Sequence, residues 1–387
     1  MKITYRILSA AVLAVSLASV PTSHAQKTIS PPQKYLVFAG TYTNKTQSKG
    51  IYALDFDAAT GKLTLKGVAA ETPDPSWVII HPNGKFLYAA NETGKASTVS
   101  AFALDAKSGA LTPLNQMSTQ GEDPCYLSID KTGKYLFAAN YTSGNVVVFP
   151  ILPDGKLGEH TSAAKDAGPL GPNKERQEGP HAHWIESSPD NRFVFVADLG
   201  LDAILSYRFD ATKGTLTLNK PFLRPLEAGA GPRHAVFSPD GHHFYVLSEL
   251  DSTVTEFAYA PDHGVFGYLG GVRMLFPDFQ GRNDAAEIAI HPSGKWLFAS
   301  NRGYDAIGVF SVDTATGKLR SAGDYSTLGK EPRHFALDPS GQFLLAENQY
   351  SEYIVTFRID PATGALSQVS STEGVPSPVC LAFYPAR

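Results

Sequence analysis

Two histidines, His181 and His183, follow a Gly-Pro pair in the segment GPHAHWIESSPDNRFVFVAD at residues 179–198. Imidazoles at this spacing point the same way on a strand. They could bind a metal ion, exchange a proton near neutral pH, or satisfy polar groups at a strand end. Further along the chain, Arg233, Glu249 and Arg302 offer groups that bind anions or accept protons. The available chemistry therefore depends on the elements that bring these side chains together.

The segment around the two histidines is one copy of an internal repeat. Copies begin at positions 75, 124, 180, 232, 285 and 332, for example PSWVIIHPNGKFLYAAN and PRHFALDPSGQFLLAEN. Each copy predicts an apolar strand, a tight Pro-Asp-Gly type of turn and a second apolar strand. Two more strands then follow around a Thr-Gly or Ser-Gly turn. Four strands about every 50 residues are typical of β-propeller blades. The copy at 180 has two extra residues, which we place before its turn.

The two ends of the chain complete a seventh blade. The C-terminal segment PVCLAFYPAR predicts a first strand, and KYLVFAGTYT followed by IYALDFDAATGKLT predicts the other three. Pairing these segments closes the ring and leaves no exposed strand edge. We therefore predict an all-β fold, a seven-bladed β-propeller whose last blade is closed by the N- and C-terminal strands. It would form a single domain over residues 26–387.

The predicted strand order decides which residues share a face. In each blade the first strand begins and the second strand ends at one face, here called the top face, around the central axis. Charged residues and histidines at these positions crowd blades three to six, whereas blades one, two and seven offer mostly small or neutral groups. The predicted catalytic set is His181, His183, Arg233, Glu249 and Arg302, and the predicted substrate-binding set is His234, Glu287, Asn301, Arg333, His334 and Glu347.

This uneven distribution favours a functional site, because a ring built only for stability would be similar in all blades. Buried strand ends nevertheless need hydrogen-bond partners, and we favour that structural role for Asn91, Asn140 and Asn301. The long connection KDAGPLGPNKERQEGP at 165–180 either covers the top face or is a surface excursion. Cys125 and Cys380 fall in non-adjacent blades and out of register, so we expect neither a disulfide nor a catalytic thiol.

The first 25 residues are typical of a signal peptide. Lys2 and Arg6 precede the apolar run ILSAAVLAVSLASV, and SHA precedes Gln26. We expect the mature chain in the periplasm or outside the cell, with no stable membrane insertion after cleavage. The net charge of −4, without basic blocks, excludes nucleic acid as an expected partner. The sequence carries no signal for the oligomeric state.

Several segments together carry a resemblance to a known family: GPHAH (179–183), GPRHAVFSPDG (231–241), LSELDSTV (247–254), AEIAIHPSGKWLFASNRG (286–303) and EPRHFALDPSGQFLLAENQ (331–349). The chain resembles the seven-bladed lactonases, which include propeller-type 6-phosphogluconolactonases and fungal 3-carboxy-cis,cis-muconate lactonizing enzymes. The resemblance implies an enzyme for lactones of anionic sugars or dicarboxylic acids, with no metal firmly required, and we expect no cofactor. It also implies an active site of His181 or His183 with Arg233, Glu249 and Arg302.

Our leading hypothesis is hydrolysis of a small-molecule lactone that is anionic or polyhydroxylated. Arg233 and Arg302 would hold the substrate and stabilise the oxyanion, while Glu249 or the blade-three histidine would activate water. Arg333, His334 and Glu287 would position the substrate. Export favours an unphosphorylated aldonolactone over a phosphorylated one.

Two other functions would use the same residues. One is a lactone-forming cycloisomerase of the muconate type, and the other is a periplasmic propeller that binds a ligand without chemistry. A metal site at His181 and His183 would lack a third ligand at a fixed spacing, and the charge of Arg233 would repel a cation. We therefore expect no metal.

Overall fold

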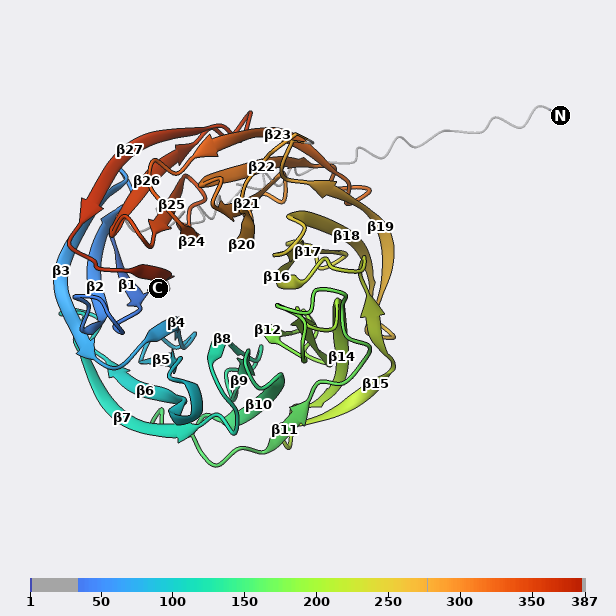
Figure 1. Ribbon diagram of the computed structural model, residues 1–387, viewed down its shortest axis with the longest axis horizontal. Coiled ribbons are helices and arrows are strands. Elements are labelled where there is room, and N and C mark those ends of the chain that lie inside the picture. The colour runs from blue at the N-terminus through green and yellow to red at the C-terminus, as the bar shows by residue number, and fades with distance from the viewer. Residues whose placement is uncertain (2–33, 277, 385–387) are drawn as a thin grey trace. The chain divides into compact units, whose positions relative to one another are not determined.

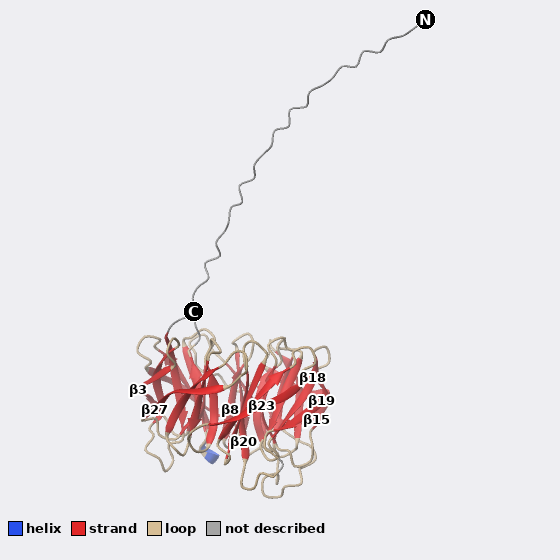
Figure 2. Cartoon of the chain, turned by 90° about the horizontal axis from the view of Figure 1, so that it is seen from above, coloured by secondary structure: helices blue, strands red, loops and turns tan. Residues whose placement is uncertain are grey.

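The computed structural model describes residue 1 and residues 34–276 and 278–384. The predicted signal peptide therefore lies outside the described residues, apart from Met1. Within the described part of the chain, seven antiparallel sheets of four strands surround a central axis (Figure 1). Loops connect the strands at both ends of the ring (Figure 2). The predicted seven-bladed propeller is confirmed.

The first six blades follow the chain in order. The strands of blades one to three are β4 (Pro75–Ile80), β5 (Phe86–Asn91), β6 (Thr98–Leu104) and β7 (Leu111–Ser118); β8 (Pro124–Ile129), β9 (Tyr135–Asn140), β10 (Asn145–Pro150) and β11 (Ser162–Lys165); and β12 (Ala182–Ser187), β13 (Phe193–Asp198), β14 (Ala203–Asp210) and β15 (Thr215–Pro225). A 3-10 turn, η1 (Gly94–Ala96), precedes β6.

The strands of blades four to six are β16 (Pro232–Phe237), β17 (His243–Ser248), β18 (Thr253–Ala260) and β19 (Val265–Arg273); β20 (Asp284–Ile290), β21 (Trp296–Arg302), β22 (Ala306–Val312) and β23 (Leu319–Ser326); and β24 (Pro332–Leu337), β25 (Phe343–Asn348), β26 (Tyr353–Ile359) and β27 (Leu366–Glu373).

The seventh blade joins the two ends of the chain. C-terminal β28 (Pro378–Phe383) is its innermost strand and pairs with β1 (Lys34–Thr41), followed by β2 (Gly50–Asp57) and β3 (Lys62–Glu71). The register sets Phe38 opposite Ala382 and Ala39 opposite Leu381. The predicted closure by the terminal strands is therefore confirmed.

Apolar residues hold neighbouring blades together. The inner strands are buried on both faces, since another blade packs on each side; in β13, for example, all residues of FVFVAD are buried. The outermost strands alternate buried and exposed residues, as in β3. Between blades three and four, Trp184, Phe195 and Phe244 form part of one aromatic core. This packing fixes the blades and so positions the side chains at the strand ends.

The tight turns between first and second strands lie at the face opposite the mouth. In blade six this turn contains Gly341, which has φ +72°. A Cβ at this position would lie 2.5 Å from Nε2 of His291 in the neighbouring blade. Glycine is therefore required both by the backbone conformation and by the close approach of the next blade.

The structure corrects the register that we assigned to blade three. Strand β12 begins at Ala182, which pairs with Asp198, so Ala182 takes the place that Pro232 takes in blade four. The two extra residues therefore precede the strand rather than its turn. His183 lies on the strand and His181 lies before it, so the two side chains do not share a strand face as predicted.

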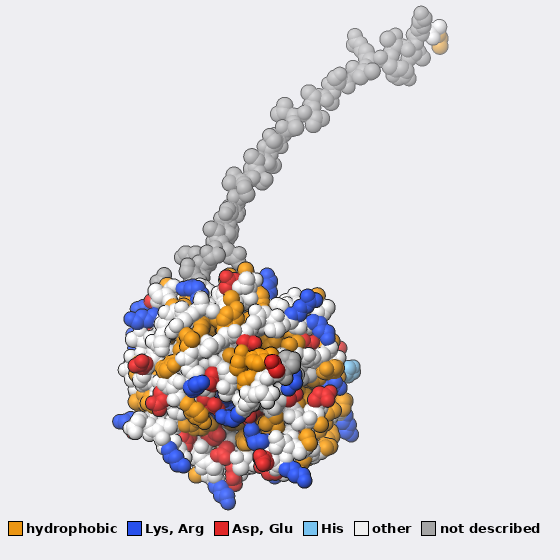
Figure 3. Space-filling view, turned by 45° about the horizontal axis from the view of Figure 1, so that its top comes forward, with side chains coloured by type: hydrophobic (Ala, Val, Ile, Leu, Met, Phe, Trp, Pro, Cys, Tyr) orange, Lys and Arg blue, Asp and Glu red, His pale blue; other side chains and the backbone are white. Residues whose placement is uncertain are grey.

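The surface in Figure 3 carries basic and acidic side chains interspersed with small hydrophobic patches. Among the described residues, no helix is long and apolar enough to cross a membrane.

Candidate active site at the mouth of the propeller

Three rings of residues form the mouth, the opening of the central axis at the top face. In each blade, the residue equivalent to Pro232 pairs with a residue of the second strand, and the upper ring consists of the residues that follow these partners. They are Tyr42, Glu92, Tyr141, Leu199, Glu249, Arg302 and Gln349. The first ring is the second residue of each first strand, counted from the Pro232 position: Ser76, Cys125, His183, Arg233, Ala286, Arg333 and Val379. The second ring consists of the residues that directly follow those of the first ring in sequence: Trp77, Tyr126, Trp184, His234, Glu287, His334 and Cys380. Equivalent backbone positions thus bring residues from all seven blades to one opening.

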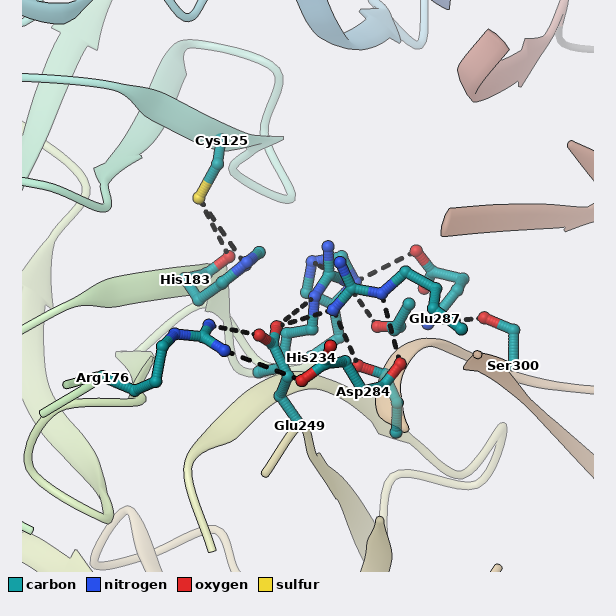
Figure 4. A network of polar contacts seen from close by, with 12 residues as sticks. Cys125, Arg176, His183, His234, Glu249, Asp284, Glu287 and Ser300 are labelled. Carbon is teal, nitrogen blue, oxygen red and sulfur yellow. Dashed lines mark hydrogen bonds and ion pairs between the residues drawn. The ribbon is translucent and has the colours of Figure 1, made fainter. Parts of the chain in front are cut away.

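Glu249 is the centre of charge in this mouth. Its Oε2 lies 3.1 Å from Nε of Arg233 and 3.0 Å from Nη2 of Arg302, and Arg176 binds its Oε1 (Figure 4). Burial by itself raises the pKa of Glu249, but the charges of Arg302 and Arg233 outweigh burial and hold the pKa below its ordinary value. Glu249 is therefore ionised, and guanidinium groups occupy both of its oxygens.

Positive charge is crowded around this carboxylate. Burial and the neighbouring charges of Arg302 and Arg333 lower the pKa of Arg233 to about 10. A site in which guanidinium groups repel one another favours an incoming anion or a developing oxyanion. The geometry thus suits a reaction in which negative charge appears on an oxygen atom.

The long connection before blade three reaches into the mouth. Besides Glu249, the guanidinium of its Arg176 lies 3.3 Å from the hydroxyl of Tyr141 and 3.6 Å from a carboxylate oxygen of Asp284. The sequence left open whether this loop covers the top face or is a surface excursion. These contacts show that the loop reaches the mouth. Arg176 was not among the predicted site residues.

A chain of buried hydrogen bonds runs from Arg233 to blade six. Arg233 Nη1 donates to Nε2 of His234 at 3.1 Å, and Nδ1 of His234 lies 3.0 Å from Oε2 of Glu287. This pattern assigns the His234 proton to Nδ1. Burial, followed by the charge of Arg233, lowers the pKa of His234 well below its ordinary value, so this imidazole is neutral.

The chain continues through His334. Its Nε2 lies 3.5 Å from Oε2 of Glu287 and its Nδ1 lies 2.5 Å from Oε2 of Glu347. Burial raises the pKa of Glu287 to about 6, even though His334 and Arg233 act in the opposite direction. Burial also raises the pKa of Glu347. The predicted residues His234, Glu287, His334 and Glu347 therefore form one connected group beneath Arg233.

Aromatic rings close the axis at the level of the second ring. Trp77 contacts the rings of His234 and His334 at centroid distances of 5.5 and 5.3 Å, and Tyr126 contacts Trp77 at 4.1 Å. These four residues come from blades one, two, four and six. Beyond Trp77 and Tyr126, residues farther along the first strands line a separate cavity of about 410 Å³. Trp77 and Tyr126 therefore lie between the charged cluster of the mouth and this cavity.

The two histidines of the opening segment have different surroundings. His183 occupies the first ring between Cys125 and Arg233; its Nδ1 lies 3.6 Å from Sγ of Cys125, and its ring lies 5.1 Å from that of His234. Burial, followed by the charge of Arg233, lowers the pKa of His183 well below its ordinary value. His183 is therefore a neutral imidazole at the edge of the charged cluster.

His181 turns toward blade two. Its ring stacks on Tyr141 at 4.6 Å, its Nδ1 donates to the carbonyl oxygen of Tyr141 at 2.9 Å, and its Nε2 lies 3.2 Å from Glu178. The structure thus brings His183, but not His181, to Arg233. The arrangement therefore favours His183 over His181 as the active-site histidine of blade three.

Arg333 occupies the opposite side of the first ring. Its guanidinium lies 5.4 Å above the ring of Tyr42, whose hydroxyl donates to Oε2 of Glu92 at 2.7 Å. Burial lowers the pKa of Arg333, but the neighbouring Tyr42 and Glu92 outweigh this effect and raise it overall. Among the described residues, Arg333 makes no ion pair. It is therefore a cation of the mouth that Glu249 does not neutralise by contact.

Asn301 forms its side-chain hydrogen bond outside this charged cluster. Its side-chain oxygen accepts a hydrogen bond from Nδ2 of Asn283, in the loop before its own blade, at 2.8 Å. Asn91 and Asn140 similarly donate to Pro73 and Thr119 of the preceding loops. These contacts support the structural role, which makes Asn301 the weakest member of the predicted substrate-binding set.

No group of three or more His, Cys, Asp or Glu side chains is arranged to hold a metal ion within the residues that the structure describes. His181 and His183 do not converge on a common point, because they contact different partners. Cys125 and Cys380 are both free and buried. Burial raises the pKa of the Cys125 thiol, which makes it a weak nucleophile.

The predicted catalytic and substrate-binding sets leave out four mouth residues: Tyr42, Glu92, Tyr141 and Arg176. Glu92 and Tyr141 take the same position as Glu249, immediately after a second strand, so the repeat itself places them at the top face. The sequence alignment took Gly40 and Thr41 as the exit of blade seven, one residue too early; Thr41 pairs with Pro378, and Tyr42 follows it.

Comparisons with known proteins agree with this architecture. The family described as Lactonase, 7-bladed beta-propeller, matches residues 36–383. A 6-phosphogluconolactonase from Bacillus subtilis is 36% identical over 350 residues, covering 90% of this chain and 98% of that protein. One from Formosa agariphila is 35% identical over 306 residues, with coverage of 78% and 85%. The structure of the Pseudomonas aeruginosa periplasmic gluconolactonase superposes with a TM-score of 0.85 at 33% identity, over 92% of this chain and 100% of that one. The chain belongs to the seven-bladed β-propeller lactonase family.

Proposed function

We propose that the protein hydrolyses a sugar-acid lactone at the mouth of the propeller. The observation that carries this proposal is the Arg233–Glu249–Arg302 arrangement beside the neutral His183. Lactone hydrolysis creates negative charge on the carbonyl oxygen and needs a group that takes a proton from water. Guanidinium groups suit the first requirement and a neutral imidazole suits the second.

In the proposed reaction, His183 takes a proton from water while the water oxygen attacks the lactone carbonyl carbon. Arg233 and Arg302 stabilise the negative oxygen of the tetrahedral intermediate. The carbonyl then re-forms, the bond between the carbonyl carbon and the ring oxygen breaks, and His183 returns its proton to the leaving alkoxide. The product is the open hydroxy acid. Glu249 serves to position the arginines, because guanidinium groups occupy both of its carboxylate oxygens.

The proposed substrate is an unphosphorylated aldonolactone in the periplasm. The signal-peptide pattern of residues 1–25 supports export, and the structural relative from Pseudomonas aeruginosa is named as a periplasmic gluconolactonase. Relatives named 6-phosphogluconolactonase support the reaction class.

Acid release from a panel of lactones tests the proposal. The purified mature chain should open glucono-δ-lactone faster than the spontaneous reaction, as followed with a pH indicator. 6-Phosphoglucono-δ-lactone and a muconolactone belong in the same panel. Binding without acid release would contradict hydrolysis and favour a ligand-binding propeller, while formation of a lactone from a muconate-type acid would indicate a cycloisomerase.

A further inference from the structure

A second hollow opens on the mouth above blades six, seven and one. This cavity, here called the tyrosine cavity, has a volume of about 580 Å³ and is lined principally by Tyr42, Asn44, Glu92, Gln349, Tyr350 and Glu352. Tyr42, Glu92 and Gln349 follow the ends of strands β1, β5 and β25, whose places in the ring Figure 1 shows. Its volume lies in the range of small-molecule sites, ~300–1,000 Å³.

The tyrosine cavity shares the upper ring of residues with the candidate active site. Tyr42, Glu92 and Gln349 belong to the upper ring, as do Glu249 and Arg302. Arg333 of the first ring stacks on Tyr42 and contributes to the electrostatic field at His183 and Arg233. A ligand held by Arg233 could therefore extend one part of its structure across Arg333 into the cavity.

The lining is polar throughout and has aromatic faces. The remaining lining residues are Lys45, Thr46, Asp74 and Ser377. Tyr350 is 66% exposed, which is high for so large a side chain. Within the described part of the chain, the side chains of Asn44, Gln349 and Glu352 carry no hydrogen bond. Amides and carboxylates with free lone pairs, beside an exposed aromatic face, are suited to the hydroxyl groups and the apolar faces of a sugar ring.

Charge narrows the class of ligand further. The cavity contains the carboxyl groups of Asp74, Glu92 and Glu352 but a single lysine, Lys45. A phosphate or carboxylate substituent would meet repulsion there, whereas a neutral hydroxyl group can donate a hydrogen bond to Glu352. Asp74 and Glu92 already accept hydrogen bonds from Thr43 and Tyr42. The observations therefore favour a neutral, polyhydroxylated group.

We propose that the tyrosine cavity is a subsite for a glycosyl residue attached to the lactone, so that the preferred substrates are aldonolactones of disaccharides or longer saccharides. This inference rests on the proposed lactone hydrolysis and names its substrate class. The lactone ring would lie between Arg233, Arg302 and His183, and the sugar substituent would lie against Tyr350 and Gln349.

The test compares lactones that differ only in the substituent. Initial rates are measured for glucono-δ-lactone, for maltobiono-δ-lactone with a 4-linked sugar, and for melibiono-δ-lactone with a 6-linked sugar. The protein should show a higher kcat/KM for at least one glycosylated lactone, mainly through a lower KM. The preference is the ratio of the two kcat/KM values. Tyr350→Ala should reduce it roughly two- to tenfold, which is the range of an aromatic contact.

Tyr268→Ala is the matched control, because Tyr268 is 59% exposed on the outer strand β19 and far from the upper ring. It should leave both the preference and the individual rates unchanged. A protein that opens all three lactones without preferring a glycosylated one, or a preference that survives in Tyr350→Ala, would overturn the subsite while leaving lactone hydrolysis intact.

Binding of the ring-opened acids separates this inference from the reaction itself. Calorimetric titration with maltobionate, melibionate and gluconate should show tighter binding of a glycosylated acid, and Tyr350→Ala should remove that difference. If no lactone is opened but this difference in binding is present, the hydrolysis proposal fails and the sugar subsite stands. If neither is observed, both proposals are wrong.

Discussion

Glu249 and Glu92 occupy the same backbone position in different blades, yet their surroundings differ in kind. Glu249 contacts three guanidinium groups, and their charges lower its pKa despite burial. Glu92 accepts a hydrogen bond from Tyr42, and burial raises its pKa although Arg333 acts in the opposite direction. The repeat sets where a carboxylate stands, and the neighbouring blades and the long loop decide its protonation.

The comparison divides the mouth into two halves. The half around Glu249 is rich in ion pairs and is suited to stabilising an oxyanion, whereas the half around Glu92 opens into a polar cavity. If this division is correct, substitutions in the first half should affect turnover strongly, and substitutions in the second half should have smaller effects. The following predictions test it.

The largest expected effect is that of Arg233→Ala. Losing an oxyanion donor should lower kcat for lactone hydrolysis by about 10²–10³-fold. Arg302 and Arg176 still pair with Glu249, so the far-ultraviolet circular dichroism should remain that of a folded propeller. The control is Arg320→Gln, an exposed charge on β23, which should leave turnover unchanged. If Arg233→Ala keeps turnover near the wild-type value, the reaction does not take place in this half of the mouth.

His183→Gln should lower kcat by roughly 10²-fold or more, as expected for the loss of a general base. The pKa of His183 is lowered, so the group stays neutral through pH 6.5 and becomes protonated only at clearly lower pH. The wild-type rate should therefore hold through neutral pH and fall on the acidic side. A pH–rate profile measures this, and the acidic fall should disappear in His183→Gln.

His181→Gln is the matched comparison, since His181 contacts Tyr141 and Glu178 instead of the charged cluster. It should retain the shape of the wild-type pH–rate profile. If instead His181→Gln removes the acidic fall, the assignment of the two histidines must be reversed.

Glu249→Gln should destabilise the protein at pH 7 by about 3 kcal/mol, because three guanidinium groups lose a buried counter-charge. The folded-state pKa of Glu249 is depressed, so its stabilisation is present above the ordinary carboxyl pKa and is lost as pH falls below it. Urea unfolding at pH 7 and at pH 4 should show the difference between wild type and variant shrinking toward acid. A constant difference would contradict the ionised state assigned to Glu249.

The smallest expected effect is that of Tyr42→Phe, which removes the hydrogen bond to Glu92. The free energy of unfolding should fall by about 1 kcal/mol, as for one net hydrogen bond. Tyr268→Phe serves as the control in the same urea titration. A loss as large as that of Glu249→Gln would show that the two halves depend equally on their carboxylates.

The repeat pattern in the sequence predicted much of the fold and part of the candidate site. Strand–turn–strand copies such as 232–248 predicted blades, and their alignment placed Arg233, Glu249, Arg302 and Arg333 at one face. Position in a repeat is encoded locally, by apolar alternation and turn residues, so the sequence reveals it directly. The same alignment failed at blade three, where the two extra residues precede the strand, and at blade seven, where the exit was placed one residue too early.

By itself, the sequence determined the seven blades, their closure by the terminal strands and the group of charged residues at the mouth. Only the tertiary structure decided that His183 rather than His181 meets Arg233, that Arg176 reaches Glu249 from the long loop, and that Tyr42 and Glu92 border a second cavity. The reason is physical. Blade identity depends on local periodicity, whereas these contacts join different blades and loops, and their distances and pKa shifts arise only when the ring is closed and water is excluded from its mouth.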